Sequence, residues 1–465
     1  MTVVEKNTPI IDILKEIEGA KYKTVYITHL GKLIGSITDG DIRRAIIKNG
    51  FDNLNVLEVM NPKPTHRSFD GTIVNKKNTE INIRALPLLG KNGEIIDEMH
   101  VYEKFLPIAE PLLDENEFNL IDKAYQSSWI SSSGEFITKF EQYFALLHNI
   151  PHAVSCSNGT AALFLALSAI GLSADDEVIV PTLTFGAVAN SVILAGGNPV
   201  FVDLEAHRPL MDIDQIVRSI TTKTKVILVV HSYGYVVNIE KLKTLIPKNI
   251  KIIEDCAEAH FAELNGNLVG TQSDIACYSF FANKILTTGE GGICISSNPK
   301  LVKKMRVLRD HGMSPSKRYW HEVVGFNLRL TNMQAAVGVA QLNRLDSILE
   351  QRKRSCHLWE QFLIRIGLEA SIIPSIVNEK RGLWLYNIRL DEYEKNKLKN
   401  KLKKASLETR DFFYCLNKMP PFSKYKCSRI DNAEKWEKNG LSLPVYSDSL
   451  NNHILEIRLK NVHYS

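Results

Sequence analysis

Short runs of valine, isoleucine and leucine recur between residues 150 and 300, and they constrain the fold more than any other feature of the chain. Each run is apolar almost without interruption, and helical stretches such as Ala161–Ile170 and Ala187–Ala195 lie between the runs. Continuous apolar strands are typical of a parallel sheet that helices cover on both faces. The sequence therefore predicts an α/β fold with a mostly parallel sheet between helices. The predicted strands are Ala153–Cys156, Glu177–Val180, Pro199–Asp203, Lys225–His231, Lys251–Asp255, Ile275–Phe280 and Gly292–Ser296.

The length of 465 residues predicts two or three domains. Residues 106–345 carry the alternating strands and helices and form the expected large domain. Longer helices with charged faces follow and mark a further expected domain, 346–465. Within it, Leu398 and Leu402 lie at helical spacing among lysines, which indicates a solvated amphipathic helix. Residues 1–105 differ in character and form a separate expected domain.

The composition argues against several classes of protein. The net charge of +5 is small for this length, so charge does not predict nucleic-acid binding. The 7 cysteines are scattered without a CxxC pair, which predicts reduced thiols in a cytoplasm and no metal site. No apolar run is long enough to cross a bilayer, and residues 1–19 lack the apolar core of a signal peptide. We therefore expect a soluble, cytoplasmic protein that binds neither nucleic acid nor membranes.

One lysine lies at a position that suits an amine able to attack a carbonyl group. Lys284 lies between the end of the predicted strand Ile275–Phe280 and the glycine-rich turn Thr288–Gly292. A lysine held partly out of water has a lowered pKa, and its free lone pair can attack a carbonyl group. Most lysines are solvated surface residues, so Lys284 indicates a reactive amine only together with the segments around it.

A second segment predicts an anion site. Ser157–Leu163 follows the strand Ala153–Cys156 and opens a helix. Gly159 allows a tight turn, and the first N–H groups of the helix together with the Thr160 hydroxyl favour a phosphate group. An ordinary helix cap by Asn158 or Thr160 explains the same residues equally well.

Two further strands end in side chains that suit a flat, nitrogen-containing ring. Asp255 ends a strand at the edge where parallel sheets bind ligands, and it could pair with a protonated pyridine nitrogen, which makes a pyridoxal ring an electron sink. Phe185 follows another strand and could lie against the ring face. The alternatives are a helix cap for Asp255 and a core position for Phe185. For His260 we expect a structural role.

Together these segments resemble the DegT/DnrJ/EryC1/StrS family of sugar aminotransferases, which are fold-type I enzymes dependent on pyridoxal 5′-phosphate (PLP). The resemblance runs from about Pro107 to the C-terminus, and its motifs occur in the order that the family shows. The motifs are Trp129–Gly134, Asn158–Ala161, Glu254–Ala257, Ser279–Lys284, Arg309–Gly312, Gly325–Ala336 and Leu441–Pro444. For residues 346–465 the resemblance implies a small C-terminal α+β domain.

The resemblance implies roles for single residues. Lys284 would bind the cofactor as a Schiff base and act as nucleophile, acid and base. Asp255 would bind the ring nitrogen, Glu258 would lie near the ring hydroxyl, and Phe185 would stack on the ring. The remaining cofactor-binding residues would be Asn158, Gly159, Thr160, Ala161 and Ser279, of which the last three would hold the phosphate.

The resemblance also implies an assembly and an amino donor. Asn327 would reach the phosphate from the neighbouring subunit, which implies a homodimer with shared active sites. Arg329 would be the candidate for binding the carboxylate of the donor, which is expected to be glutamate.

Three segments bear on the acceptor: Arg318–Asn327, Leu407–Tyr414 and Met419–Phe422. They resemble the members of the family that aminate GDP-4-keto-6-deoxymannose at C4. The alternatives are a UDP- or dTDP-linked keto sugar as the acceptor, the dehydratase branch of the family, and a non-catalytic nucleotide-sensing protein. The dehydratase branch carries histidine where this chain has Lys284.

The first 105 residues contain two similar units. Val25–Thr28 and Leu33–Ile37 predict two strands joined by a turn, and the helix Ile42–Lys48 follows. Leu86–Leu89 and Glu94–Ile96 repeat only the strand–turn–strand half of that pattern. We therefore expect a tandem whose second unit is degenerate.

This tandem resembles a pair of CBS domains. The resemblance rests on Gly35–Arg44 and Val56–Asn61. It implies that Thr38 and Asp41 line a site for an adenine nucleotide. The alternative is that Asp41 caps the helix that follows it.

Overall fold

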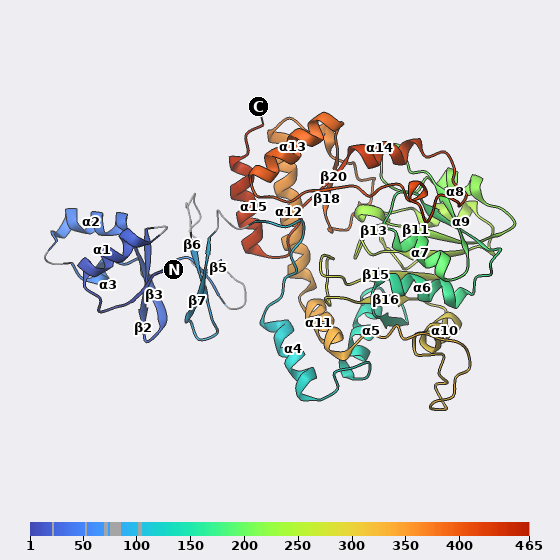
Figure 1. Ribbon diagram of the computed structural model, residues 1–465, viewed down its shortest axis with the longest axis horizontal. Coiled ribbons are helices and arrows are strands. Elements are labelled where there is room, and N and C mark those ends of the chain that lie inside the picture. Colours follow the sequence, from blue (N-terminus) through green and yellow to red (C-terminus); the bar gives the residue numbers. More distant parts are fainter. Residues whose placement is uncertain (21–22, 52–53, 69–72, 75–84, 101–104, 465) are drawn as a thin grey trace. The chain divides into compact units, whose positions relative to one another are not determined.

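A sheet of seven strands lies at the centre of the part of the chain that follows residue 105 (Figure 1). The strand order is β10-β9-β11-β12-β15-β16-β8. Neighbours from β10 to β15 are parallel, and β16 runs antiparallel to both of its neighbours. The predicted mostly parallel sheet is therefore confirmed. The strands are β8 (Ala153–Cys156), β9 (Glu177–Pro181), β10 (Asn198–Val202), β11 (Thr224–Val230), β12 (Lys251–Asp255), β15 (Ile275–Ser279) and β16 (Gly292–Ile295).

Helices cover both faces of this sheet, so each strand has two buried sides. In β9, Ile179 belongs to the same hydrophobic cluster as Phe140 of α5. Its neighbour Val178 points the other way and joins Leu163 of α6 and Val188 of α7. The alternation of side chains along a strand explains why nearly every strand residue is apolar. The helices before residue 345 are α4 (Glu115–Gln126), α5 (Glu135–Leu147), α6 (Gly159–Ile170), α7 (Ala187–Leu194), α8 (Ile213–Ser219), α9 (Ile239–Leu245), α10 (Pro299–Arg309) and α11 (Asn332–Asn343).

A smaller antiparallel sheet follows in the chain, with the order β18-β20-β19. The helix predicted around Leu398 is confirmed, since α13 buries Leu398 and Leu402 among lysines. The elements of this part are α12 (Leu345–Arg365), β18 (Tyr386–Arg389), α13 (Glu392–Lys404), β19 (Arg410–Asp411), α14 (Asp431–Asn439), β20 (Gly440–Leu443) and α15 (Ser449–Asn461). A further small sheet joins β13 (Glu263–Leu264), β14 (Asn267–Leu268) and β17 (Glu379–Lys380).

The structure is a computed structural model, and it describes residues 1–20, 23–51, 54–68, 73–74, 85–100 and 105–464. By internal contacts the chain forms two units. One comprises Met1–Phe105 and Asp448–Ile457, and the other comprises Leu106–Ser447 and Arg458–Ser465. The expected boundary at residue 345 falls inside the second unit, where α12 begins. The division of that unit into a large and a small domain stays a prediction.

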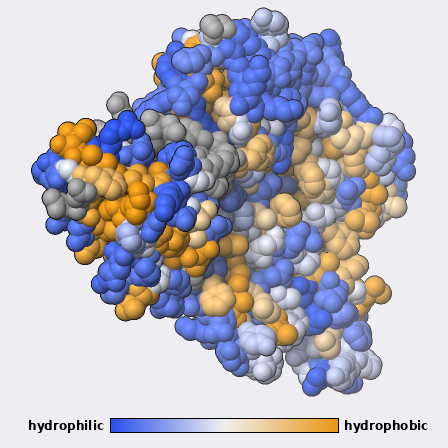
Figure 2. Space-filling view, turned by 60° about the vertical axis from the view of Figure 1, so that its left-hand side comes forward, coloured by the Kyte–Doolittle hydropathy of each residue, from blue (hydrophilic) through white to orange (hydrophobic). Residues whose placement is uncertain are grey.

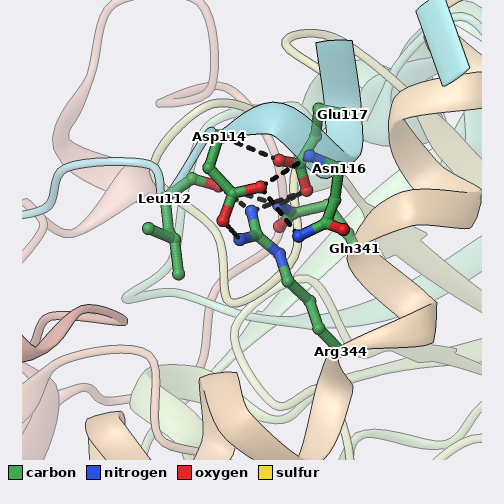
Figure 3. A network of polar contacts seen from close by, with 6 residues as sticks. All are labelled: Leu112, Asp114, Asn116, Glu117, Gln341 and Arg344. Carbon is green, nitrogen blue, oxygen red and sulfur yellow. Dashed lines mark hydrogen bonds and ion pairs between the residues drawn. The ribbon is translucent and has the colours of Figure 1, made fainter. Parts of the chain in front are cut away.

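A buried network of hydrogen bonds and ion pairs connects the start of α4 to the junction of α11 and α12 (Figure 3). Arg344, between the two helices, pairs with the Asp114 carboxylate and donates to Glu117 Oε1 at 2.6 Å and to the Leu112 carbonyl at 2.7 Å. Gln341 donates to the same Glu117 oxygen at 2.8 Å. Asp114 and Glu117 also form the capping box of α4. One guanidinium therefore satisfies two buried carboxylates and orients three helices.

The N-terminal unit contains two sheets, β1-β2-β3 and β5-β4-β6-β7. The strands predicted around Val25 and Leu33 and the helix from Ile42 are confirmed, and so is the hairpin of β6 and β7. The elements are β1 (Val3–Glu5), α1 (Ile10–Gly19), β2 (Thr24–His29), β3 (Lys32–Thr38), α2 (Asp39–Asn49), α3 (Val56–Val59), β4 (His66–Arg67), β5 (Ile73–Val74), β6 (Ala85–Leu89) and β7 (Ile95–His100).

The helices of this unit carry apolar side chains on their outer surface as well as in the core. Ile13 and Ile17 of α1 are buried, whereas Ile11 of α1, Ile47 of α2 and Leu57 of α3 are each about half exposed or more. Figure 2 shows apolar surface gathered at the left of the view. No helix among the described residues is long and apolar enough to span a bilayer.

Candidate active site

The residues predicted to act together meet in one cavity of about 630 Å³. They come from different parts of the sequence, and they converge because the carboxyl ends of parallel strands lie at one edge of a sheet. Eight predicted residues line the cavity: Asn158, Gly159, Thr160, Phe185, Asp255, Glu258, Ser279 and Lys284.

The start of α6 presents open N–H groups to this cavity. Asn158 is the N-cap, and its Oδ1 accepts from the Ala161 N–H at 2.8 Å. Its carbonyl accepts from the Ala162 N–H. Within the described part of the chain, the N–H groups of Gly159 and Thr160 have no acceptor. Asn158 therefore does cap the helix, yet two N–H groups at its positive end remain free for an anion.

Gly159 brings Ser279 to the same place. A Cβ atom at Gly159 would lie 2.6 Å from Cβ of Ser279, so only glycine allows this approach of α6 to the end of β15. Ser279 and the exposed Thr160 then line the cavity together with Gly159, so two hydroxyl side chains accompany the open N–H groups. Ala161 is buried one position further along and does not line the cavity.

Lys284 lies in the turn after β15, and its amine is held beside an aromatic ring. Its Nζ is 4.2 Å from the centroid of the Trp384 ring, and Trp384 donates from Nε1 to the Asn283 carbonyl at 2.9 Å. Burial lowers the pKa of Lys284; the carboxylates of Glu258 and Asp255 oppose that shift, and the charge of Arg410 adds to it. A lowered pKa makes the neutral, nucleophilic amine more accessible.

Two carboxyl groups face Lys284 from the edge of the sheet. Asp255 ends β12 and accepts from the Ala257 N–H at 3.0 Å, in a local turn rather than at a helix cap. Glu258 accepts through Oε2 from the Tyr233 N–H at 2.7 Å. Burial raises the pKa of both side chains, that of Glu258 to about 7. A cation bound beside Asp255 would reverse this shift.

His260 and Phe185 differ in their surroundings. His260 is buried against the rings of Tyr278 and Phe280, and burial lowers its pKa to about 3, in keeping with the structural role expected for it. Phe185, by contrast, is 61% exposed and lines the cavity. This phenylalanine is available to a ligand and is not part of the core.

Three lining residues come from the smaller sheet and the loops beside it, namely Trp384, Arg410 and Phe413. The sequence placed Arg410 and Phe413 in a segment that bears on the acceptor, but it predicted no role for either, and it missed Trp384. These residues lie 100 positions or more from Lys284, and no local pattern marks them. Only the packing of the two sheets could reveal them.

Two predicted residues lie outside the cavity of their own chain. Arg329 donates to Asp310 at 2.9 Å and to Asn327 at 3.0 Å. Asn327 is bridged to Asp310 through the backbone. Neither Asn327 nor Arg329 lines the cavity that holds Lys284.

In the N-terminal unit, Thr38 and Asp41 form a capping box at the start of α2. The Asp41 N–H donates to Thr38 Oγ1, and the Thr38 N–H donates to Asp41 Oδ2 at 2.9 Å. Arg44 donates to the other Asp41 oxygen at 2.6 Å. The cap that we gave as the alternative is therefore present.

Among the described residues, His231, Glu254 and Cys256 are the group whose potential metal ligands lie close together. Both nitrogens of His231 are already engaged, Nε2 with Glu254 at 2.8 Å and Nδ1 with the Val237 N–H at 3.1 Å. The Gly270 N–H also donates to Glu254. The group is a hydrogen-bonded network behind β12 rather than an open set of ligands.

Known proteins are similar to this chain in sequence and in fold. GDP-perosamine synthase of Caulobacter vibrioides is 39% identical over 346 residues, 74% of this chain and 93% of the relative. GDP-perosamine synthase of Vibrio cholerae is 35% identical over 357 residues, 76% of this chain and 97% of the relative. A solved PLP-form of the Streptococcus pneumoniae protein Spr1654 is 25% identical, has a TM-score of 0.68, and covers 77% of this chain and 98% of that one. These matches confirm the fold class predicted from the sequence. Residues 111–458 match the DegT/DnrJ/EryC1/StrS aminotransferase family, and the chain belongs to that family.

Proposed function

We propose that this protein is a PLP-dependent aminotransferase that converts GDP-4-keto-6-deoxymannose into GDP-perosamine, with glutamate as the amino donor. The observation that carries the proposal is the convergence of Lys284, Asp255 and the open end of α6 in one cavity. The choice of the GDP-linked sugar rests on relatives named GDP-perosamine synthase, which are 35 to 39% identical over most of their length.

The residues of the cavity fit each part of the cofactor. The free N–H groups of Gly159 and Thr160 and the Ser279 hydroxyl suit a phosphate dianion. Asp255 suits a protonated ring nitrogen, and the exposed ring of Phe185 suits the face of a flat ring. When bound, PLP supplies an electron sink that stabilises a negative charge on the reacting carbon.

The remaining chemistry falls to Lys284. Its amine would first be the nucleophile that binds the cofactor, and once released it would carry a proton between the reacting carbon of the substrate and the cofactor. Its lowered pKa favours acceptance of the proton, and the face of Trp384 would stabilise the ammonium that results. Glu258, near the expected ring hydroxyl, would share a proton with that group.

Absorbance spectra of the purified protein with PLP test the proposal. We expect a band from the lysine-bound cofactor that glutamate bleaches and that GDP-4-keto-6-deoxymannose restores. Recovery with a UDP- or dTDP-linked keto sugar instead would keep the chemistry and change the substrate. Lys284→Ala should abolish both the band and turnover, and a variant that keeps both would contradict the assignment of Lys284.

We further propose that the enzyme is a homodimer in which Asn327 of each subunit reaches the cofactor phosphate of the other. The position of Asn327 outside its own cavity supports this arrangement. A monomer in sedimentation experiments that retains full activity would contradict it.

For the N-terminal unit we propose a CBS-type module that binds an adenine nucleotide near Thr38 and Asp41. A ribose would have to compete with Arg44 for the Asp41 carboxylate, so we expect weak binding. Calorimetry with AMP and ATP, with Asp41→Ala as the control, tests this role. An absence of binding heat with the wild-type protein would contradict it.

A further inference from the structure

The cavity holds a second cation that has no assigned partner. Among the described residues that line it, only Lys284 and Arg410 carry a positive side chain, whereas Asp255, Glu258 and Glu290 are acidic. Lys284 is occupied by the chemistry proposed above. Arg410 is then the remaining group in the described lining with which an anion can pair.

The Arg410 side chain is not neutralised by the protein. It makes no ion pair and no side-chain hydrogen bond with any residue that the structure describes. Its neighbour Asp411 pairs instead with Lys399 at 2.5 Å and Lys395 at 3.5 Å, on α13. The backbone of Arg410 is held by pairing with Ser442 of β20. The strand thus fixes the position of an arginine whose guanidinium remains open.

The charge of Arg410 reaches the reacting groups. It lowers the pKa of Lys284, in the same direction as burial, and it opposes the rise that burial causes in the pKa of Glu258. Asp255 and Glu258, which also line the cavity, are acidic and offer a carboxylate no positive charge to pair with. An anionic group of a substrate that reacts at Lys284 is therefore directed toward Arg410.

We propose that Arg410 binds the α-carboxylate of the amino donor. This inference rests on the proposed aminotransferase function. The donor carries its carboxylate on the same carbon as the reacting amine, so the carboxylate must lie beside Lys284. A guanidinium matches a carboxylate with two parallel hydrogen bonds, which fixes the orientation of the donor as well as its affinity.

Two alternatives fit the geometry less well. Arg329, the candidate from the sequence, does not line the cavity of its own chain, and even where the proposed dimer would bring it near the neighbouring site its charge is already paired with Asp310. The diphosphate of the nucleotide sugar is also an anion, but it is attached at C1, across the sugar ring from the C4 carbonyl that must approach Lys284. An anion site in the same cavity as the reacting amine therefore suits the donor better than the acceptor.

Binding measurements on the PLP-loaded enzyme test this role. Glutamate is titrated by the change in the cofactor band, and 2-oxoglutarate and GDP are titrated by calorimetry, because neither can react with the PLP form. In Arg410→Gln we expect the Kd of glutamate and of 2-oxoglutarate to rise by about 10- to 100-fold, as the loss of a charge-assisted pair implies. The absorbance of the bound cofactor and the Kd of GDP should each change by less than about twofold, which is the range typical of a substitution that removes no binding contact. Arg410→Lys keeps the positive charge, so its Kd for both dicarboxylates should lie between that of the wild type and that of Arg410→Gln.

Arg329→Gln tests the competing assignment, and if Arg410 binds the donor this variant should weaken the binding of both dicarboxylates much less than Arg410→Gln does. The proposal is overturned if Arg410→Gln binds both as the wild type does, if it weakens GDP binding alone, or if Arg329→Gln weakens glutamate instead. A wild-type enzyme whose PLP band responds to no amino acid would contradict the proposed function itself, and the role of Arg410 with it.

Discussion

Glu258 is buried on one side and open on the other. Its Oε2 accepts from the Tyr233 backbone, and the residue lines the cavity that holds Lys284. Burial raises its pKa to about 7, although the charge of Lys284 acts in the opposite direction. The folded protein therefore keeps a proton on Glu258 at pH values where the unfolded chain, with an ordinary pKa of 4.5, has released it.

This difference predicts how stability varies with pH. The contribution of Glu258 is fully present below pH 4.5 and is lost as the pH rises through about 7. Glu258→Gln stays neutral, so the variant without cofactor should match the wild type near pH 4.5 and exceed it at pH 8 by on the order of 2–3 kcal/mol. Urea unfolding of both proteins at the two pH values measures the difference. Glu350→Gln, at an exposed position of α12, should show no such dependence. An equal difference at both pH values would disprove the assignment.

At the scale of single residues, the sequence predicted the groups that end strands and missed those that depend on packing. Lys284 and Asp255 were found because each lies at the end of an apolar run, where a parallel sheet binds ligands. Arg410 and Trp384 have no such signal, since a short antiparallel sheet far along the chain brings them in. Arg329 was expected to bind the carboxylate of the donor; in its own chain it pairs with the Asp310 carboxylate, and its role toward the donor stays a prediction that the Arg329→Gln variant tests.

At the scale of elements, the network around Arg344 holds three helices in register. The carboxylates of Asp114 and Glu117 are both buried, and one guanidinium pairs with the two of them. Burial raises the pKa of Glu117 because it disfavours the charged carboxylate, and the charge of Arg344 acts in the opposite direction. Loss of the arginine would leave two buried acids without a countercharge.

Arg344→Met should therefore destabilise the protein strongly. Removal of one partner from a buried ion pair typically costs about 3–5 kcal/mol, which urea unfolding at pH 7 would detect as a lower midpoint. Adding Asp114→Asn and Glu117→Gln removes the unpaired charges and should recover part of the loss. A single variant as stable as the wild type would show that the network does not hold the helices.

The elements themselves were predicted within one or two residues where burial is two-sided, as in β8, β12 and β15. The two-residue strands β13, β14, β17 and β19 were not predicted, because they are too short to show a periodic pattern and exist only through pairing with a distant segment. The antiparallel direction of β16 could not be predicted from the sequence either. Its apolar run resembles that of its parallel neighbours.

At the scale of the whole molecule, the dimer proposed above predicts that two defective subunits can together form one intact active site. If Asn327 acts in the neighbouring site, each active site combines Lys284 of one chain with Asn327 of the other. A subunit with Lys284→Ala and a subunit with Asn327→Ala then form a mixed dimer with one doubly defective site and one intact site. Each variant alone forms dimers in which both sites are defective.

Mixing the two inactive variants should therefore restore activity. After unfolding and refolding together in equal amounts, half of the dimers are mixed and each has one intact site, so about a quarter of the wild-type activity should return. Refolding each variant alone is the control, and neither should recover. If Asn327 acts within its own chain, every mixed dimer keeps one defect in each site, and the mixture should show no more activity than the average of the two variants.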